Sequence, residues 1–131
     1  MFSDNVRDFM IAAGRRTRVR GYNGNEYEVE LDDNEIKLLD LPYLQPIELD
    51  LFDAIEDILR SAPNGIMKKG CAREKLDSPK LSMNDTIMGR LGRDYYGLNP
   101  GDSMIDQACY IYAILAAAGC IRNLRGKIRL I

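Results

Sequence analysis

The sequence predicts an α+β fold that is mainly helical, and three patterns in it support this class. Residues 47–62 place an apolar residue every three or four positions, as an amphipathic helix does. Residues 16–32 alternate apolar and charged side chains on either side of a turn sequence, which is typical of a β-hairpin. Residues 120–131 contain two short apolar stretches around Leu124-Arg125-Gly126, so we expect the chain to end in a second hairpin.

The first 32 residues are expected to form a helix followed by the first hairpin. Residues 3–13 have a helical apolar face, with Ser3 as the capping residue and Gly14 as the stop. For the hairpin, a three-residue loop at 23–25 places Val19 opposite Val29. The same register puts basic residues opposite acidic ones on the other face, as Arg20 with Glu28, Arg18 with Glu30 and Arg16 with Asp32.

The rest of the chain is expected to be a larger module that begins near two prolines. We expect one or two helical turns at 34–41, and Pro42 and Pro46 then mark a boundary. The sequence therefore divides into an acidic helix-and-hairpin extension, 1–44, and a domain, 45–131. In that domain we expect helices at 47–62, at 68–76, from Ser82 or Asn84 to Tyr96 and at 103–118, with a very short strand at 66–67.

Composition excludes several classes of function. The chain has no histidine, which removes the commonest general base and the commonest zinc ligand. Its three cysteines are widely spaced, so we expect reduced thiols, neither a disulfide framework nor a metal site. No set of base, nucleophile and oxyanion donor can be assembled, so we predict no enzymatic activity and no cofactor. The first ten residues lack a basic segment and no apolar run would span a bilayer, which predicts a cytoplasmic protein.

Charge is unevenly distributed along the chain although the net charge is only −2. Residues 21–57 contain twelve acidic residues and one cation, Lys37, whereas residues 66–131 contain eleven cations and six acidic residues. This asymmetry favours an anionic partner for the C-terminal part. It also leaves open attraction between the two parts of the chain.

The stretch ACYIYAILAAAGCIRNLRGKIRLI, residues 108–131, resembles the end of a winged-helix domain. In that superfamily a helix often ends in Ala-Gly, an apolar strand follows, and an Arg-Gly turn forms the wing. Ala118-Gly119, Cys120-Ile121 and Arg125-Gly126 match this pattern. The resemblance is greatest to the small winged-helix domains of transcription regulators and to those that precede Mrr-type restriction nucleases, and it implies a winged helix with double-stranded DNA as partner.

Residues that could contact DNA follow from this interpretation. Cations of the wing can reach phosphates or a minor groove, and these are Arg122, Arg125, Lys127 and Arg129. Arg90 and Arg93 add positive charge on the preceding helix. The helix at 103–118 occupies the position of a recognition helix, yet it contains no Lys or Arg and offers only Gln107 for base contacts.

Other patterns allow alternative interpretations. A Gly-x-x-Gly at 89–92 occurs in modules that bind single-stranded nucleic acid, but we expect it to let helices pack closely. Asp50, Asp53, Glu56 and Asp57 lie opposite the apolar stripe of their helix and are expected to be solvated. A protein-interaction module remains the main alternative function, with the acidic segment 26–57 meeting a basic protein partner or the N-terminal hairpin pairing two copies into a homodimer.

Overall fold

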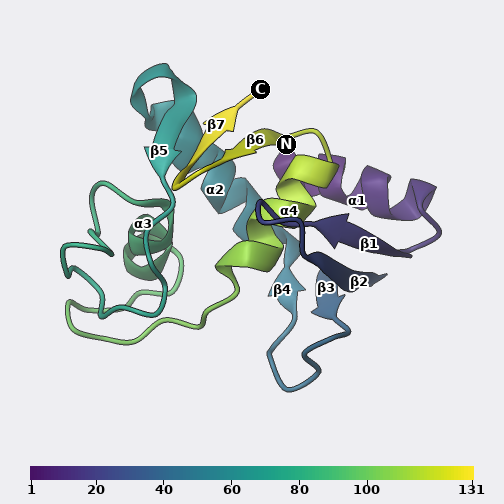
Figure 1. Cartoon of the computed structure of the whole chain (residues 1–131), viewed down its shortest axis with the longest axis horizontal. Helices are drawn as coiled ribbons and strands as arrows, with labels where there is room; N and C mark the ends of the chain where they lie inside the picture. Colours follow the sequence, from purple (N-terminus) through teal and green to yellow (C-terminus); the bar gives the residue numbers. More distant parts are fainter.

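The computed structural model describes residues 1–131 and contains two small antiparallel sheets and four α-helices (Figure 1). About 34% of the residues are helical and 23% lie in strands, so the fold is α+β and the expected predominance of helix was too strong. None of the helices is long and apolar enough to cross a membrane. The elements are α1 (Phe2–Ala12), β1 (Arg16–Arg20), β2 (Glu26–Asp32), β3 (Glu35–Leu38), β4 (Ile47–Glu48), α2 (Leu49–Ser61), a 3-10 turn (Pro63–Gly65), β5 (Ile66–Lys68), α3 (Ile87–Asp94), α4 (Ala108–Ala117), β6 (Ile121–Leu124) and β7 (Lys127–Leu130).

The first sheet contains the predicted hairpin, in a register two residues away from the predicted one. Its strands follow the order β1-β2-β3-β4, and Arg18 lies opposite Glu28 instead of Glu30. The loop has five residues, 21–25, closed by a hydrogen bond of 2.8 Å from the Gly21 amide to the Asn25 carbonyl. A shift of two positions keeps every side chain on its predicted face. Charged residues therefore still share one face, and Val19 is buried on the other.

Residues 35–38 form strand β3, so the helical turns expected at 34–41 are absent. Ile36 and Leu38 are buried while Glu35 and Lys37 are not, which is the period of two that a half-buried strand requires. A two-residue turn joins β2 to β3, and Asp33 takes up a left-handed backbone with φ 56°. Asp is one of the few residues other than Gly that tolerates this conformation.

Met1 is the N-cap residue of helix α1, and carboxylates of α2 accept hydrogen bonds from the first amides of the helix. The Phe2 amide donates to Glu56 and the Ser3 amide to Asp53, each at 2.8 Å. Ser3 therefore lies inside the helix and is not its cap. Two of the four acidic residues expected to be solvated are used in this way, because carboxylates satisfy amides that have no partner within the helix. Glu56 is also buried, at 7% exposure.

The second sheet has the order β5-β7-β6 and packs against α2. Residues 69–86 connect β5 to α3 through turns, so the helix expected at 68–76 is absent. Helix α3 is capped by Thr86, whose hydroxyl accepts a hydrogen bond from the Gly89 amide at 3.0 Å. Helix α4 begins at Ala108 and not at Ser103, since residues 102–107 form no regular structure and the Asp102 carbonyl accepts a hydrogen bond from the Leu76 amide.

The two predicted segments, 1–44 and 45–131, share one hydrophobic core. Strand β4 belongs to the second segment by sequence but pairs with β3 of the first. Helix α4 packs against β1, β6 and α1, and it lies between the two sheets (Figure 1). The N-terminal helix and sheet are therefore part of the same folded unit as the C-terminal hairpin.

Candidate nucleic-acid interface

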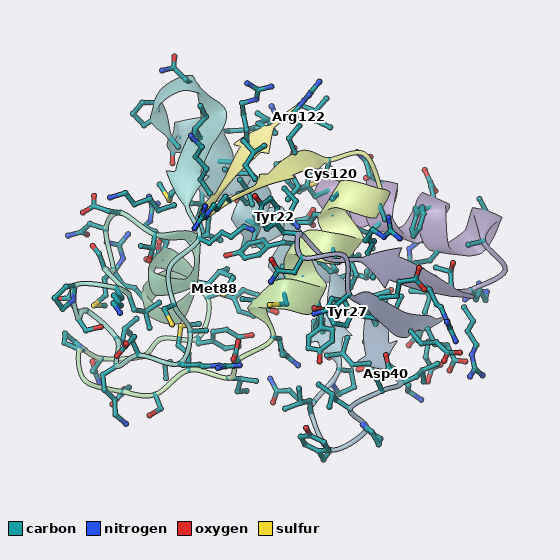
Figure 2. The ribbon with its side chains drawn as sticks, viewed as in Figure 1. Tyr22, Tyr27, Asp40, Met88, Cys120 and Arg122 are labelled. Atoms are coloured by element: carbon teal, nitrogen blue, oxygen red, sulfur yellow. The ribbon has the colours of Figure 1, made fainter.

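The sheet β5-β7-β6 has one buried face and one basic face. Ile121 and Ile128 point into the core, and the residues that alternate with them point outward. Figure 2 labels Arg122 on this sheet, at the end of the molecule where β6 and β7 lie. We refer to the outward side as the basic face; its residues are Ile66, Lys68, Arg122, Leu124, Lys127 and Arg129, with Arg125 at the adjoining turn.

Cations lie directly opposite cations on the basic face. Arg122 of β6 is the cross-strand partner of Arg129 of β7, and Lys68 of β5 is the partner of Lys127. All four side chains belong to exposed residues, and none takes part in an ion pair within 4.0 Å. Like charges placed directly opposite destabilise a sheet. The folded chain therefore presents a cluster of positive charge that contains no ion pair, with Asp85 in the groove beside Lys68 and Lys127.

The first sheet arranges its cations differently. Arg16 forms an ion pair with Glu28 at 2.8 Å, and Arg18 and Arg20 approach Glu26 at 3.6 and 3.9 Å. Lys37 pairs with Asp32 at 2.7 Å. Acidic partners on neighbouring strands thus compensate these basic residues, whereas those of the basic face have none. The difference lies in the placement of acidic residues and not in the number of cations.

The turn of the C-terminal hairpin adds a fifth cation at the edge of the basic face. Leu124 pairs with Lys127, so the turn consists of Arg125 and Gly126 alone. Gly126 has φ 70°, a backbone that glycine adopts without a steric penalty. Both turn residues are exposed, so the Arg125 side chain projects from the end of the hairpin.

Four of the five cations were predicted from sequence, and Lys68 was not. The β6–β7 hairpin is local, so its register follows from the Arg-Gly turn. Lys68 reaches the same face only because β5 pairs with β7, which is about 60 residues away along the chain. The sequence contained one usable signal, namely the short strand expected at 66–67, without any indication of its partner strand.

Arg90 and Arg93 lie on α3 and do not belong to the basic face. Arg93 contacts Asp94 at 2.7 Å and Asn84 at 2.7 Å, and Arg90 contacts Asp94 at 3.4 Å. Hydrogen bonding from Arg93, with Arg90 assisting, lowers the pKa of Asp94. Both guanidinium groups therefore already have an acidic partner. Arg90 also lines the groove between α2 and α3 together with Asp57.

Gln107 is not available for contacts with DNA bases. It is 2% exposed, and its side-chain amide donates a hydrogen bond to the Gln45 carbonyl. Helix α4, which follows it, is enclosed by β1, β6 and α1, with six of its ten residues buried. The assignment of Gln107 as a nucleic-acid contact is therefore corrected, because the N-terminal sheet covers the helix that would enter a major groove.

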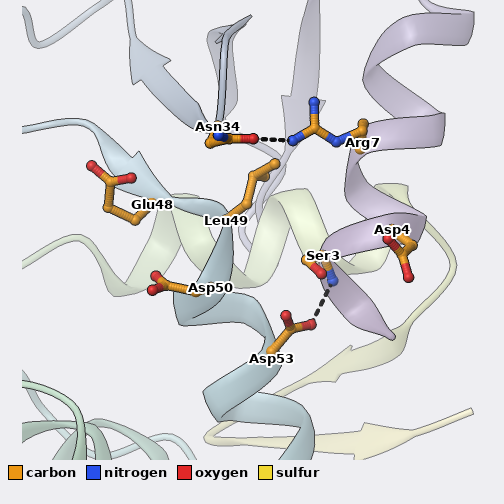
Figure 3. A pocket seen from close by; sticks show the side chains of 8 residues that line it. All are labelled: Ser3, Asp4, Arg7, Asn34, Glu48, Leu49, Asp50 and Asp53. Atoms are coloured by element: carbon orange, nitrogen blue, oxygen red, sulfur yellow. Dashed lines mark hydrogen bonds between the residues drawn. The ribbon is translucent and has the colours of Figure 1, made fainter.

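Acidic residues gather elsewhere in the molecule, around the N-terminal end of α2. A cleft of about 350 Å³ there is lined by Asp50 and Asp53 of α2, Asp4 and Arg7 of α1, and Glu48 of β4. Figure 3 shows these side chains around it, with Asp53 directed towards Ser3. Glu48 of β4 lies directly opposite Glu35 of β3. Partial desolvation and the nearby Glu35 carboxylate raise the pKa of Glu48. The protein thus has an acidic cluster as well as a basic one.

Comparison of the chain with protein-family models, with curated proteins and with solved structures finds no match. The function must therefore be inferred from the arrangement of side chains.

Proposed function

We propose that the protein is a non-catalytic DNA-binding protein, regulatory or accessory, that contacts phosphates through the basic face. The observation that supports this most is the pair of cation–cation neighbours, Arg122 with Arg129 and Lys68 with Lys127, which have no acidic partner. Mutual repulsion of these pairs is relieved when a polyanion lies across the sheet. Phosphates on a nucleic-acid backbone supply charges at the repeated spacing that such a flat cluster can meet.

The order of elements supports the resemblance of residues 47–131 to a winged helix. A helix, a strand, two helices and a hairpin follow one another, and the first strand joins the sheet of the hairpin. Because α4 is enclosed, we propose a winged-helix variant that binds DNA with its wing and sheet instead of a recognition helix. Such binding reads little sequence, since contacts to phosphates position a protein without specifying bases.

The test is fluorescence anisotropy of a labelled random 20-base-pair duplex with the full chain, at several salt concentrations between about 50 and 200 mM. The informative variant combines Arg122→Gln and Arg129→Gln. Its matched control combines Arg18→Gln and Arg20→Gln, which changes the net charge equally on the first sheet. We expect the first variant to reduce the slope of log affinity against log salt by about 2, because each of the two arginines neutralises one phosphate.

The control variant should keep the slope of the unmodified protein. An equal decrease in both variants would show that net charge alone attracts DNA and would refute an interface at the basic face. Absence of salt-sensitive binding by the unmodified chain, to this duplex and to its separated strands, would refute the function itself.

A second candidate function is a protein interaction through the acidic cluster. The Glu35–Glu48 pair favours it, because a basic partner would relieve the repulsion between the two carboxylates, which adds to desolvation in raising the pKa of Glu48. A labelled octalysine peptide is a suitable probe. Salt-sensitive binding that is abolished in the Glu35→Gln/Glu48→Gln variant, but retained in Arg122→Gln/Arg129→Gln, would support this function.

A further inference from the structure

A second recess lies beside the basic face, between the β1–β2 loop and the first turn of α4. It has a volume of about 310 Å³ and is more apolar than the acidic cleft. Lys69 in its wall directly follows Lys68 of the basic face, and the Lys69 amide donates to the Gly126 carbonyl of the hairpin turn at 2.9 Å. We refer to this recess as the tyrosine pocket; its lining includes Tyr22, Tyr27, Lys69, Cys109, Tyr112 and Asn123.

The pocket contains a cation without an ion-pair partner, since Asp106, the carboxylate in its lining, pairs with Arg73 at 3.1 Å. The Lys69 ammonium lies 5.1 Å from the ring centre of Tyr22 and 5.3 Å from that of Tyr112, and it forms no ion pair. Burial lowers the pKa of Lys69, because desolvation disfavours the charged form. Aromatic rings compensate a desolvated cation only in part. An anion at the mouth of the pocket would complete the site.

The walls of the pocket offer both a stacking surface and unused hydrogen-bonding capacity. Tyr22 is 52% exposed, so its ring is accessible from solvent, and Figure 2 shows it beside α4. Asn123 of β6 lines the pocket, and its side-chain oxygen is buried without a hydrogen-bond partner. Rotation of the carboxamide exchanges its oxygen and nitrogen, so this side chain can offer an acceptor or a donor to a ligand.

We propose that the tyrosine pocket receives the base of an unpaired nucleotide, with the adjoining phosphate at Lys69 and the flanking phosphates on the basic face. This inference rests on the proposed function, and it adds a preference for single-stranded or unpaired segments over a perfect duplex. Aromatic side chains bind unstacked bases through their faces, whereas bases inside a duplex are not accessible to them. Successive residues of an extended chain point to opposite sides, so Lys68 lies on the basic face and Lys69 in the pocket. The Lys69 amide bonds to Gly126 of the hairpin turn, so a strand that occupies both would pass over that turn.

The first test compares a labelled 12-nucleotide single strand with the duplex of the same sequence, by anisotropy with the full chain. Tyr22→Ala removes the exposed ring of the pocket. Its control is Tyr43→Ala, another exposed tyrosine, which does not line the pocket. We expect Tyr22→Ala to weaken single-strand binding about 5- to 150-fold, the usual effect of removing one stacking ring, and to leave duplex binding within about twofold. Tyr22→Phe should retain the affinity.

The second test locates the strand without relying on a substitution. Cys109 lines the pocket and is the exposed one of the three free thiols, while Cys120 is buried. A saturating single strand should slow the reaction of Cys109 with a maleimide, as measured by mass spectrometry of the modified peptide. A duplex at equal occupancy should slow it less.

The outcomes separate this inference from the function on which it rests. If both probes bind with a salt dependence set by Arg122 and Arg129, but Tyr22→Ala affects them equally or not at all, the pocket assignment is wrong and phosphate binding stands. The same conclusion follows if Cys109 reacts at an unchanged rate in the bound protein. If neither probe binds, both proposals fail.

Discussion

Removing a cation from the basic face should make the folded protein more stable, which is the opposite of what most substitutions do. Arg129 lies opposite Arg122 and has no acidic partner. Arg129→Gln keeps the first methylene groups of the side chain and removes the charge. The matched control is Arg16→Gln, which breaks the 2.8 Å ion pair with Glu28 on the exposed surface of the first sheet.

The size of the effect follows from the sheet geometry. One directly opposite pair of charges contributes roughly 0.2–1 kcal/mol to a sheet, so Arg129→Gln should raise the free energy of unfolding by about that amount. For a domain of this length, 1 kcal/mol corresponds to a shift of about 3–5 °C in Tm, so the expected rise is about 1–5 °C. Arg16→Gln should have no effect or lower the free energy of unfolding, by at most about 1 kcal/mol, since exposed ion pairs contribute little.

Urea denaturation followed by circular dichroism is the appropriate assay, because guanidinium chloride would screen the charges under study. Each protein is measured at about 50 mM salt and at about 1 M salt. At about 1 M the Debye length is roughly 3 Å, so charges on neighbouring strands are screened. The stabilisation by Arg129→Gln should be present at low salt and largely absent at high salt. A variant that is less stable than the unmodified protein at low salt would refute the view that the basic face is under electrostatic repulsion.

Two further predictions concern contacts inside the fold. Gly89→Ala should lower the free energy of unfolding by about 2–4 kcal/mol in urea denaturation, because the added Cβ would overlap the Ser82 carbonyl and disturb the cap of α3. The control is Gly92→Ala, whose Cβ meets only flexible side-chain ends, and it should lower the free energy of unfolding by less than about 1.5 kcal/mol. Equal effects would contradict this. Glu56→Gln should cost about 1–2 kcal/mol at pH 7, because a neutral amide accepts more weakly from Phe2 and Arg60. Burial raises the pKa of Glu56, but its contacts with Phe2 and Arg60 outweigh burial, so the pKa is lowered overall. The ionised carboxylate therefore stabilises the fold above the unfolded pKa of about 4.3, and this stabilisation is lost as pH falls through the folded pKa. The Tm values of Glu56→Gln and the unmodified protein should therefore converge at acidic pH. A gap that persists there would refute this role.

Local patterns predicted much of the fold, and long-range pairings account for what they missed. The faces of the β1–β2 hairpin were predictable from alternation, but its register was not, since a three-residue and a five-residue loop put the same side chains on the same face. The alternation that makes β3 a strand was present in Glu35–Leu38, yet four residues are too few to distinguish a strand from a helical turn by periodicity. Burial of Glu56 depends on α1 packing against α2, which no local pattern contains.

The candidate site likewise combines residues that local patterns predict with residues that only tertiary packing brings together. The hairpin cations Arg122, Lys127 and Arg129 were predictable, because a two-residue turn determines which of them share a face. The tyrosine pocket was not, since Tyr22, Lys69 and Tyr112 are brought together from distant parts of the chain.

The arrangement of charge also bears on whether the acidic segment masks the basic face. None of the nine ion pairs joins an acidic residue of 21–57 to a cation of β5, β6 or β7. Glu35 and Glu48 instead repel each other on the other sheet, and the enclosed helix α4 lies between the sheets. Folding therefore keeps the two clusters apart although opposite charges attract. If the proposed function holds, an anionic partner would bind the basic face without displacing the acidic residues, and binding would require no release of the N-terminal segment. Because α1 and β1 pack against α4 and residues 1–44 share the core, removal of residues 1–44 would expose apolar surface.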